Sequence, residues 1–307
     1  ETLVLSILNY DSAVAAAASR MTSAALDRPC LEMGARRANE EAAIAAARAA
    51  VIAGFVGTSD LEAGRRYGLT TIGTAAHAFT LLHDDEKAAF AAQIATLGKN
   101  TTLLVDTYDT MQGVRNAIEV AGTDLGAVRI DSGDLCAIAQ EVRDLLDSLG
   151  ATNTKITVSS DLDEFSIASL GVAPVNSYGV GTSVVTGSGA PTCSMVYKLV
   201  GREGPSGEIE AATKKSAMKE STGGRKNAAR RLDSAGRAVD DIVITGPEAA
   251  VANWRPDSTG MRGLHVPLVV NGEIDDRWTG ADAVTAAADR HQASRAELPR
   301  GARRLSA

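Results

Sequence analysis

The densest group of chemically useful side chains is the segment Arg129-Ile130-Asp131-Ser132-Gly133-Asp134, which begins inside a short apolar run. Successive side chains of an extended strand point to opposite faces, so Arg129 and Asp131, on either side of Ile130, point to the same face. Gly133 lets the backbone approach a ligand closely, and the carboxylates could hold Mg²⁺ or a ribose. The structural alternative is that Ser132 or Asp134 caps the next helix, and Asp134 could do both jobs.

A histidine stands just beyond another apolar run, in Gly73-Thr74-Ala75-Ala76-His77. A lone histidine is more often structural than catalytic, but its place after a strand end favours a functional role for His77. His83, beside Asp84 and Asp85, is interpreted as a surface residue at a helix start.

Two further segments indicate a phosphate-bearing ligand. Tyr178-Gly179-Val180-Gly181-Thr182, with Thr186-Gly187-Ser188-Gly189 behind it, is rich in glycine and hydroxyl groups, and such loops present backbone N–H groups to phosphate. A tight turn that needs positive φ is an equally good interpretation, because a lone GxG is a weak motif. The second segment is a run of basic residues between positions 214 and 231. It is interpreted either as a solvent-exposed charged face or as an arm that reaches bound phosphates. Its basic residues are Lys214, Lys215, Lys219, Arg225, Lys226, Arg230 and Arg231.

The elements that must position these groups follow a repeating pattern. Seven short apolar runs are predicted strands, at residues 51–56, 69–72, 102–105, 127–130, 156–158, 175–178 and 195–200. Predicted helices span residues 1–26, 39–53, 84–97, 112–121, 135–149 and 164–170. Strand and helix in alternation predict an α/β fold with a parallel sheet, and we favour a closed barrel over an open doubly wound sheet. The carboxyl ends of the strands then share one rim, where barrel enzymes keep their chemistry.

The pattern changes after Val200. Residues 239–244 and 265–270 are strand-like, Asn271-Gly272 is a hairpin turn, and residues 281–295 form a last helix. We therefore predict two regions: a catalytic α/β barrel domain over residues 1–200, and a smaller mixed or β-rich region over residues 201–307.

Composition excludes several classes of protein. The chain has 307 residues and a net charge of −7, which argues against a nucleic-acid partner. No apolar run reaches the ~20 residues of a membrane span, and no secretory signal is visible. Cys30, Cys136 and Cys193 are widely spaced, as in a reduced cytoplasmic protein, and zinc ligand spacing is absent.

Because Thr2 already begins an apolar helix, we expect a fragment that lacks an N-terminal part.

Six motifs, taken in order, resemble nicotinate phosphoribosyltransferase. They are Glu32-Met33-Gly34-Ala35-Arg36-Arg37, Gly57-Thr58-Ser59, Gly73-Thr74-Ala75-Ala76-His77, Asp106-Thr107-Tyr108-Asp109, Arg129-Ile130-Asp131-Ser132-Gly133-Asp134 and Tyr178-Gly179-Val180-Gly181-Thr182. The resemblance implies an irregular α/β barrel of the type II phosphoribosyltransferases with a second, sandwich-like domain. It also implies the synthesis of nicotinate mononucleotide and pyrophosphate from nicotinate and phosphoribosyl pyrophosphate in NAD biosynthesis, coupled to ATP hydrolysis.

The resemblance assigns roles to the central motifs. His77 matches the histidine that the family phosphorylates from ATP, and imidazole can hold a phosphoryl group covalently. Arg129 lies near the nicotinate ring, where a guanidinium suits a carboxylate. Asp131 and Asp134 contact the ribose and take part in catalysis, and Asp106 and Asp131 are the expected Mg²⁺ ligands.

The resemblance also assigns substrate contacts. Gly179, Gly181 and Thr182 fall in the loop that holds the 5′-phosphate of the nucleotide, and Ser59 replaces an aspartate of the nicotinamide-using relative. Further substrate contacts are expected from Arg36, Ser132 and Lys198, and contacts to ATP from Lys215, Lys219 and Arg225. The full-length family member is expected to be a homodimer.

Three alternatives remain open from the sequence. A quinolinate phosphoribosyltransferase has a similar barrel and needs no ATP. A non-catalytic fragment would keep the site but only bind ligand. A metal-dependent barrel hydrolase would use Asp106, Asp109, Asp131 and Asp134, but such enzymes usually add histidine ligands.

Overall fold

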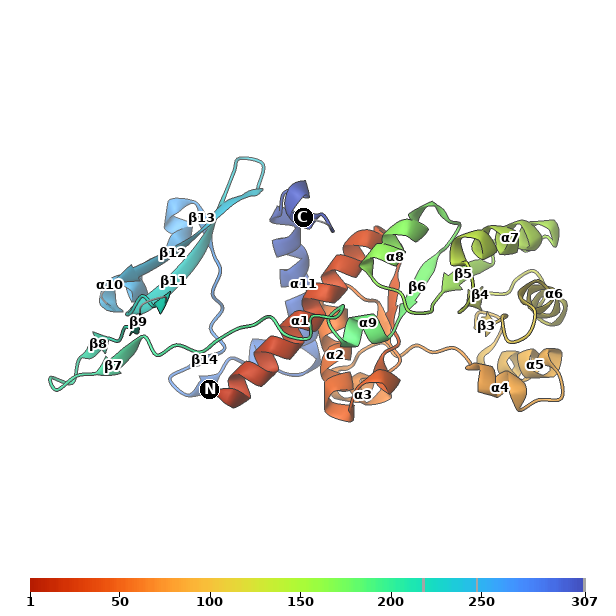
Figure 1. The fold of residues 1–307 in the computed structure, drawn as a ribbon, viewed down its shortest axis with the longest axis horizontal. Coiled ribbons are helices and arrows are strands. Elements are labelled where there is room, and N and C mark those ends of the chain that lie inside the picture. The colour runs from red at the N-terminus through yellow and green to blue at the C-terminus, as the bar shows by residue number, and fades with distance from the viewer. Residues whose placement is uncertain (217–218, 247, 306–307) are drawn as a thin grey trace. The chain divides into compact units, whose positions relative to one another are not determined.

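The computed structural model describes residues 1–216, 219–246 and 248–305. The side chains of residues 216, 219, 220, 248, 249, 258 and 259 are not described. The chain forms two compact units, one built on Asn9–Cys193 and the other on Glu1–Leu8 with Ser194–Arg304 (Figure 1). Each unit is described by itself, and the boundary predicted after residue 200 stays a prediction.

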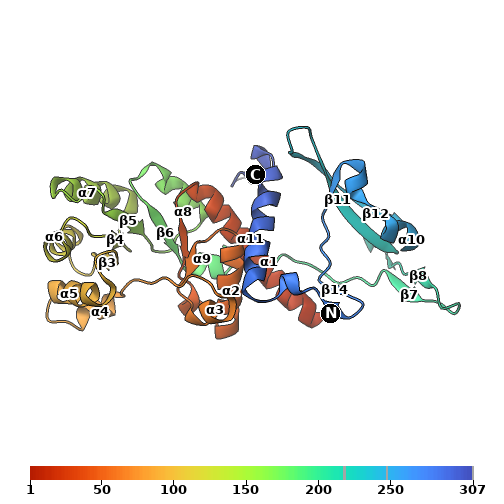
Figure 2. The ribbon, with the colours of Figure 1, turned by 180° about the vertical axis from the view of Figure 1, so that it is seen from behind.

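One six-stranded parallel sheet organises the first unit. Its order is β2 (Gly57–Thr58), β1 (Cys30–Glu32), β6 (Ser177–Val180), β5 (Lys155–Val158), β4 (Ala127–Ile130) and β3 (Thr102–Leu104). Every neighbouring pair is parallel, so the carboxyl ends of all six strands lie on one side of the sheet. Figure 1 shows the β3–β5 end of this sheet, with α5, α6 and α7 around it, and Figure 2 shows the same arrangement from behind.

The described helices of this unit are α1 (Thr2–Ala25), α2 (Glu40–Ile52), α3 (Leu61–Tyr67), α4 (His77–Leu81), α5 (Glu86–Leu97), α6 (Thr110–Ala121), α7 (Leu135–Ser148), α8 (Glu164–Ser169) and α9 (Thr182–Val185). Six of these nine described helices (α2, α3, α5, α6, α7 and α8) begin at a residue whose acidic or amide side chain caps them. Short 3₁₀ turns are η1 (Ala35–Arg37) and η2 (Leu170–Val172). Asn39, Asp85 and Asp109 each accept a backbone N–H in the first turn of the next helix, as a cap does. The predicted helices are confirmed, with boundary shifts of one or two residues.

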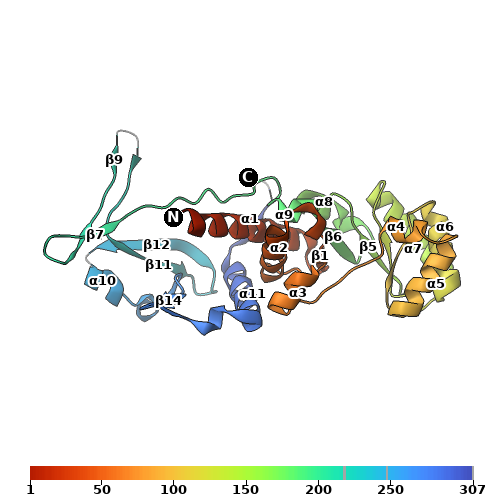
Figure 3. The same cartoon turned by 90° about the horizontal axis from the view of Figure 1, so that it is seen from below.

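Alternating apolar faces bury a continuous core between sheet and helices. Leu103, Ile130, Ile156 and Val158 of the sheet are buried, together with Met21 on the second half of α1. Each such side chain stabilises the fold by about 1.5–3 kcal/mol relative to an exposed one. Helix α1 also contacts α2 and α9, because the Tyr10 hydroxyl donates to carbonyl oxygens of both (Figure 3).

The α/β class is confirmed, but the sheet is a curled half-barrel rather than a closed ring. Among the described residues, β2 and β3 end the sheet on opposite sides. Two expected strands are missing: the run at residues 51–56 continues helix α2 through Ile52, and residues 195–200 form no strand. The run at residues 69–72 contributes one bridge, from Thr71 to Thr58.

Backbone and side-chain groups cover both of these outer strands. The amide of Thr58 donates to Thr70 O at 3.0 Å, and the amide of Ile72 donates to Thr58 O at 2.8 Å. At the other side, Gln93 Nε2 of α5 donates to Thr102 O at 2.9 Å.

The second unit is mixed and rich in antiparallel pairs. A three-stranded sheet joins β12 (Ala238–Gly246), β11 (Arg225–Leu232) and β13 (Met261–Gly263). Two-stranded pairs are β7 (Gly201–Glu203) with β8 (Ile209–Ala211), β9 (Lys215–Ser216) with β10 (Lys219–Glu220), and β14 (Val269–Val270) with β15 (Glu273–Ile274). Helices are α10 (Glu248–Asn253) and α11 (Gly280–Glu297), with 3₁₀ turns η3 (Pro256–Thr259), η4 (Asp276–Trp278) and η5 (Arg300–Arg303).

The hairpin turn predicted at Asn271-Gly272 is confirmed, with φ of 51° and 85° at its two residues. The strand predicted over residues 265–270 is confirmed only at Val269–Val270.

One described helix, α1, is long and apolar enough to cross a membrane by length and composition. The core packing of its second half accounts for part of that apolar character.

Candidate active site

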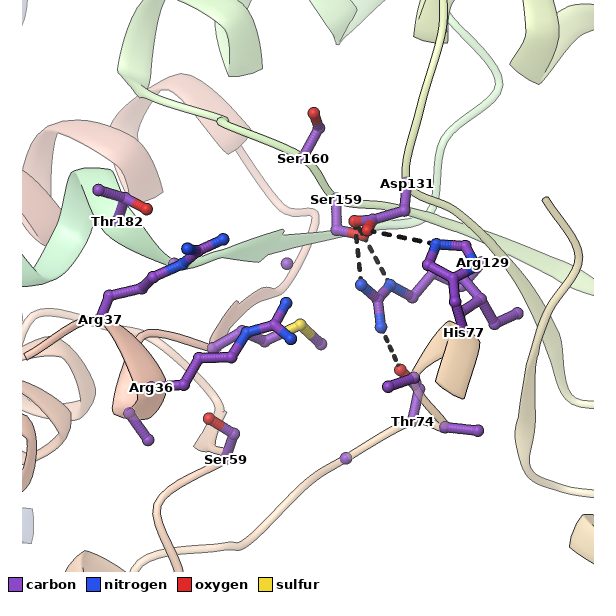
Figure 4. A pocket seen from close by; sticks show the side chains of 18 of the residues that line it. Arg36, Arg37, Ser59, Thr74, His77, Arg129, Asp131, Ser159, Ser160 and Thr182 are labelled. Carbon is purple, nitrogen blue, oxygen red and sulfur yellow. Dashed lines mark hydrogen bonds and ion pairs between the residues drawn. The ribbon is translucent and has the colours of Figure 1, made fainter. Parts of the chain in front are cut away.

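A cavity of about 450 Å³ opens at the carboxyl ends of the sheet strands. Figure 4 shows its polar side chains, which converge from several strand ends. It is lined by Met33, Ala35, Arg36, Arg37, Ser59, Gly73, Thr74, Ala75, Ala76, His77, Leu104, Arg129, Asp131, Ser159, Ser160, Asp161, Gly179, Gly181 and Thr182. The convergence of His77, Asp131 and Gly181 on a single mouth, on which the sequence interpretation depends, is therefore confirmed.

Arg129, on β4, is the best-anchored side chain of the cavity. Its Nε donates to Ser159 Oγ at 2.6 Å, Nη1 to Thr74 Oγ1 at 2.5 Å, and Nη2 to Asp131 Oδ1 at 2.9 Å. Only 8% of the residue is exposed. Three of its five N–H groups are thus committed to the protein, and the guanidinium is fixed in orientation.

Asp131 is held as a carboxylate by the same network. Burial by itself raises the pKa of Asp131, but the hydrogen bond from Ser159 and the positive charge of Arg129 outweigh burial and hold the pKa below its usual value. Ser159 Oγ donates to Asp131 Oδ1 at 2.5 Å. Asp131 is therefore ionised at neutral pH.

His77 begins α4, and its two ring nitrogens face different partners. Nδ1 lies 3.1 Å from Thr107 Oγ1. Nε2 lies 3.9 Å from Asp106 Oδ1 and 3.9 Å from Asp131 Oδ2. When Nδ1–H donates to Thr107, Nε2 keeps its lone pair, so the exposed nitrogen is available as a nucleophile or proton acceptor.

Asp106 lies behind this histidine with a side chain that is 2% exposed. Its Oδ2 accepts from the Asp131 amide at 2.9 Å and from Ser132 Oγ at 2.6 Å. Its Oδ1 is buried and has no hydrogen-bond partner. A buried carboxylate oxygen without a partner is costly, so this atom is suited to a cation or a protonated imidazole.

The described residues contain no group of three His, Cys, Asp or Glu side chains arranged to hold a metal ion. Mg²⁺ commonly takes only one or two carboxylates and completes its shell with water and substrate oxygens. Asp106 Oδ1 and Asp131 Oδ2 fit that requirement, because both face the same imidazole nitrogen.

The opposite wall carries positive charge and hydroxyl groups. Arg36 and Arg37 come from η1, Ser59 follows β2, and Figure 4 shows them across the cavity from His77 and Arg129. Two arginines facing a carboxylate–imidazole pair can bind an extended anion such as a phosphate chain.

Gly179 and Gly181 lie at the end of β6, where both pack closely against Met33, and their predicted contact with the 5′-phosphate, like that of Thr182, stays a prediction. Gly181 has a φ of −113°, and neither glycine has positive φ, so the interpretation as a turn of positive φ is wrong for this part of the segment. It is confirmed for the residues behind it, because Gly187 and Gly189 have φ of 62° and 81°. A Cβ on Gly179 would lie 2.7 Å from Met33 Sδ, and one on Gly181 would lie 3.2 Å from Met33 O. The absence of side chains lets β1 and β6 meet beneath the cavity.

Two predicted residues of the Arg129–Asp134 motif lie outside the cavity lining. Asp134 caps α7 by accepting from the Ala137 amide at 3.2 Å. Ser132 donates to Asp106 and so touches the site through that carboxylate. A catalytic role for Asp134 and a substrate contact for Ser132 stay predictions.

The predicted basic contacts belong to the other unit. Lys198, Lys215 and Arg225 are exposed there, and the side chain of Lys219 lies outside the described residues. Their predicted contacts with substrates or ATP stay predictions.

Sequence reasoning missed Thr74, Thr107 and Ser159 as site residues. Each follows the end of an apolar run, and a hydroxyl at that place is a usable signal for a strand-end site. Their partners come from other segments of the chain, which no local pattern reveals.

The fold and site define a relative of the type II phosphoribosyltransferases. The solved structure of nicotinate-nucleotide pyrophosphorylase from Pyrococcus furiosus matches with a TM-score of 0.79 and 26% identity, over 97% of this chain and 73% of that one. Human nicotinic acid phosphoribosyltransferase has the same fold, with a TM-score of 0.74 over all of this chain and 72% of that one, at 23% identity. A scan against protein-family models finds no match.

The chain is a homologue of the nicotinate phosphoribosyltransferases. It is 58% identical to nicotinate phosphoribosyltransferase pncB1 of Mycobacterium tuberculosis over 251 residues, which is 79% of this chain and 55% of that protein. It is 42% identical to the nicotinate phosphoribosyltransferase of Bacillus subtilis over 212 residues, 66% of this chain and 43% of that protein. The chain thus spans about half the length of the curated relatives it matches.

Proposed function

We propose that this chain carries the active site of a nicotinate phosphoribosyltransferase. The reaction joins nicotinate to phosphoribosyl pyrophosphate, gives nicotinate mononucleotide and pyrophosphate, and is coupled to ATP hydrolysis through phosphorylated His77. The observation that carries the proposal is the position of His77 Nε2, which lies 3.9 Å from each of two carboxylates in a cavity whose other wall is basic. The identity to named relatives supports the same substrates.

In the phosphorylation step, Nε2 of His77 attacks the γ-phosphorus of ATP. The new N–P bond forms as the bond to ADP breaks, and ADP leaves with the electron pair. Water later attacks this phosphorus, the N–P bond breaks with its electron pair returning to Nε2, and phosphate leaves, which completes the hydrolysis of ATP. Thr107 holds the ring through Nδ1, so Nε2 presents its lone pair. Asp106 and Asp131 stabilise the positive charge that develops on the imidazole.

In the transfer step, the pyridine nitrogen of nicotinate attacks C1 of the ribose and pyrophosphate leaves with the C–O bonding pair. Arg129 is positioned by Ser159, Thr74 and Asp131 to receive the nicotinate carboxylate with its remaining N–H groups. Arg36 and Arg37 bind the phosphates of phosphoribosyl pyrophosphate from the opposite wall. A neutral Ser59 hydroxyl there favours the acid over an amide substrate.

Asp106 and Asp131 are the residues that would hold Mg²⁺. When bound, the ion neutralises charge on the pyrophosphate group. We further place the reaction in the cytoplasm as part of NAD biosynthesis, in agreement with three free cysteines. A homodimer is the proposed assembly of the full-length protein.

The test is formation of nicotinate mononucleotide by the purified chain, with and without ATP and Mg²⁺. A full-length relative such as pncB1 serves as the positive control. We expect product only from nicotinate, with a rate that rises on addition of ATP. Equal turnover of quinolinate with release of CO₂ and no effect of ATP would instead identify a quinolinate phosphoribosyltransferase.

A further inference from the structure

A fully buried carboxylate lies directly beneath the cavity and takes no part in the steps above. Glu32 is the last residue of β1 and is 0% exposed. It is followed at once by Met33, which lines the cavity, and by Gly34, which leads into η1 with Arg36 and Arg37.

The Glu32 carboxylate connects two separate segments of the cavity wall. The Gly34 amide donates to its Oε1, and Thr58 Oγ1 donates to its Oε2 at 2.5 Å. The Ser59 amide donates to Glu32 O at 2.8 Å, and the Asp60 amide donates to Thr58 Oγ1 at 2.9 Å. One side chain therefore fixes both the start of η1 and the end of β2.

The surroundings of Gly34 leave little freedom for this connection to shift. A Cβ at Gly34 would lie 2.2 Å from Val185 Cγ1 and 2.8 Å from Glu32 Oε1. Burial raises the pKa of the Glu32 carboxyl, and the hydrogen bonds from Thr58 and Gly34 counteract part of that rise. Loss of the carboxylate would leave two buried donors without acceptors, and the wall would have to rearrange to satisfy them.

We propose that Glu32 is a positioning residue for substrate binding, whose carboxylate holds the start of η1 and the end of β2, next to Ser59, at a fixed separation along one wall of the cavity. The proposal rests on the proposed function, because Arg36 and Ser59 are taken as substrate contacts. These contacts form when the substrates bind and persist in the transition state, so disturbing them raises KM more than it lowers kcat.

The test compares Glu32→Gln with the same substitution at Glu164, a second buried carboxylate in the same unit. A glutamine keeps one acceptor oxygen and replaces the other by an amide donor, so one of the two connections is lost. Glu164 is 1% exposed, pairs with Arg20 Nη2 at 2.6 Å and accepts from Ser188 Oγ at 2.6 Å, but does not line the cavity. Glu164→Gln therefore reports the general cost of neutralising a buried carboxylate.

We expect Glu32→Gln to raise KM for nicotinate and for phosphoribosyl pyrophosphate about tenfold with kcat within threefold of wild type. Glu164→Gln should lower Tm without changing either KM. Calorimetric titration with each substrate should show the same weakening of Kd in Glu32→Gln alone.

Thr58→Val provides a second route, since it removes the hydroxyl partner and keeps the carboxylate. Thr58→Val should raise both KM values, and its combination with Glu32→Gln should raise them no further than the larger single effect. If Glu32→Gln fails to fold, Thr58→Val alone decides the outcome in the same way.

The possible results separate the two proposals. An active wild-type chain with unchanged KM in Glu32→Gln and Thr58→Val overturns the role of Glu32 and leaves the proposed function intact. A loss confined to kcat also overturns it. A wild-type chain that binds neither substrate and forms no product overturns the proposed function and the role of Glu32 together.

Discussion

Asp106 lies behind His77, which lines the cavity, and His77 Nε2 is 3.9 Å from Asp106 Oδ1, a buried oxygen that accepts no hydrogen bond. A buried carboxylate oxygen that accepts no hydrogen bond is poised to stabilise positive charge on the imidazole. This pairing supports the proposal that His77 accepts and holds a phosphoryl group.

Replacement of His77 should abolish phosphorylation of the protein. Incubation with γ-labelled ATP and Mg²⁺ should label the wild-type chain, and His77→Ala should carry less than about 1% of that label because the proposed nucleophile is gone. The matched control is His83→Ala, since His83 contacts the Phe79 carbonyl and does not line the cavity. Label that persists in His77→Ala would exclude the assigned role.

Asp134 can be tested separately as a helix cap and as a catalytic group. Asp134→Ala should lower the free energy of unfolding by about 1 kcal/mol, and Asp134→Ser should keep most of it because serine is also a good cap. Chemical denaturation measures this difference. Because Asp134→Ser keeps the cap and removes the carboxylate, its activity tests the carboxylate alone. A tenfold loss of activity at unchanged stability would support a catalytic role for Asp134. Full activity would show that Asp134 acts only as a helix cap.

Asp131 should make stability depend on pH in the acid range. Its pKa in the folded protein is lowered, so its contribution to stability is present above the unfolded pKa of about 4 and is lost as pH falls through the folded value. The difference in unfolding free energy between wild type and Asp131→Asn should therefore shrink below about pH 4. Denaturation curves from pH 3 to pH 7 provide the measurement, and a difference that grows at low pH would contradict the network around Arg129.

Ser160 has a strained backbone that glycine should relieve. Its φ is 126°, a region that side-chain-bearing residues rarely adopt, and it lines the cavity. Ser160→Gly should raise the free energy of unfolding by about 1 kcal/mol. Ser160→Ala removes the hydroxyl but keeps the Cβ, so it should give no such gain. Equal stability of the two variants would argue against strain at this position.

The elements that the sequence predicted best are those with local signals. Helices α5 and α6 start at Asp85 and Asp109 and stop at Gly98 and Gly122, where φ is positive. Strand β1 is not among the predicted strands, because it is three residues long and ends in a carboxylate whose partners come from Gly34 and Thr58.

Strand prediction from apolar runs fails where the apolar residues remain exposed in the structure. Val196, Tyr197 and Leu199 form an apolar run yet belong to no strand, and all three are more than half exposed. Counting this run as a strand contributed to the expectation of a closed barrel.

The site was predictable to the extent that motif residues stand at strand ends. His77, Arg129 and Asp131 converge as expected, because parallel strands bring their carboxyl ends together. The hydroxyl partners Ser159 and Thr74 become visible only in three dimensions, since their hydrogen bonds to Arg129 join segments distant in sequence.

The open curvature of the sheet has a consequence for self-association. An uncovered strand edge invites another chain to add itself and so seeds aggregation. Here the backbone of Thr70 and Ile72 shields β2, and the Gln93 amide shields the carbonyl of Thr102 on β3. The half-barrel therefore keeps an open cavity for ligands at the carboxyl ends of its strands. Because its outer strands already form hydrogen bonds at Thr58 and Thr102, they leave a second molecule fewer backbone groups with which to pair.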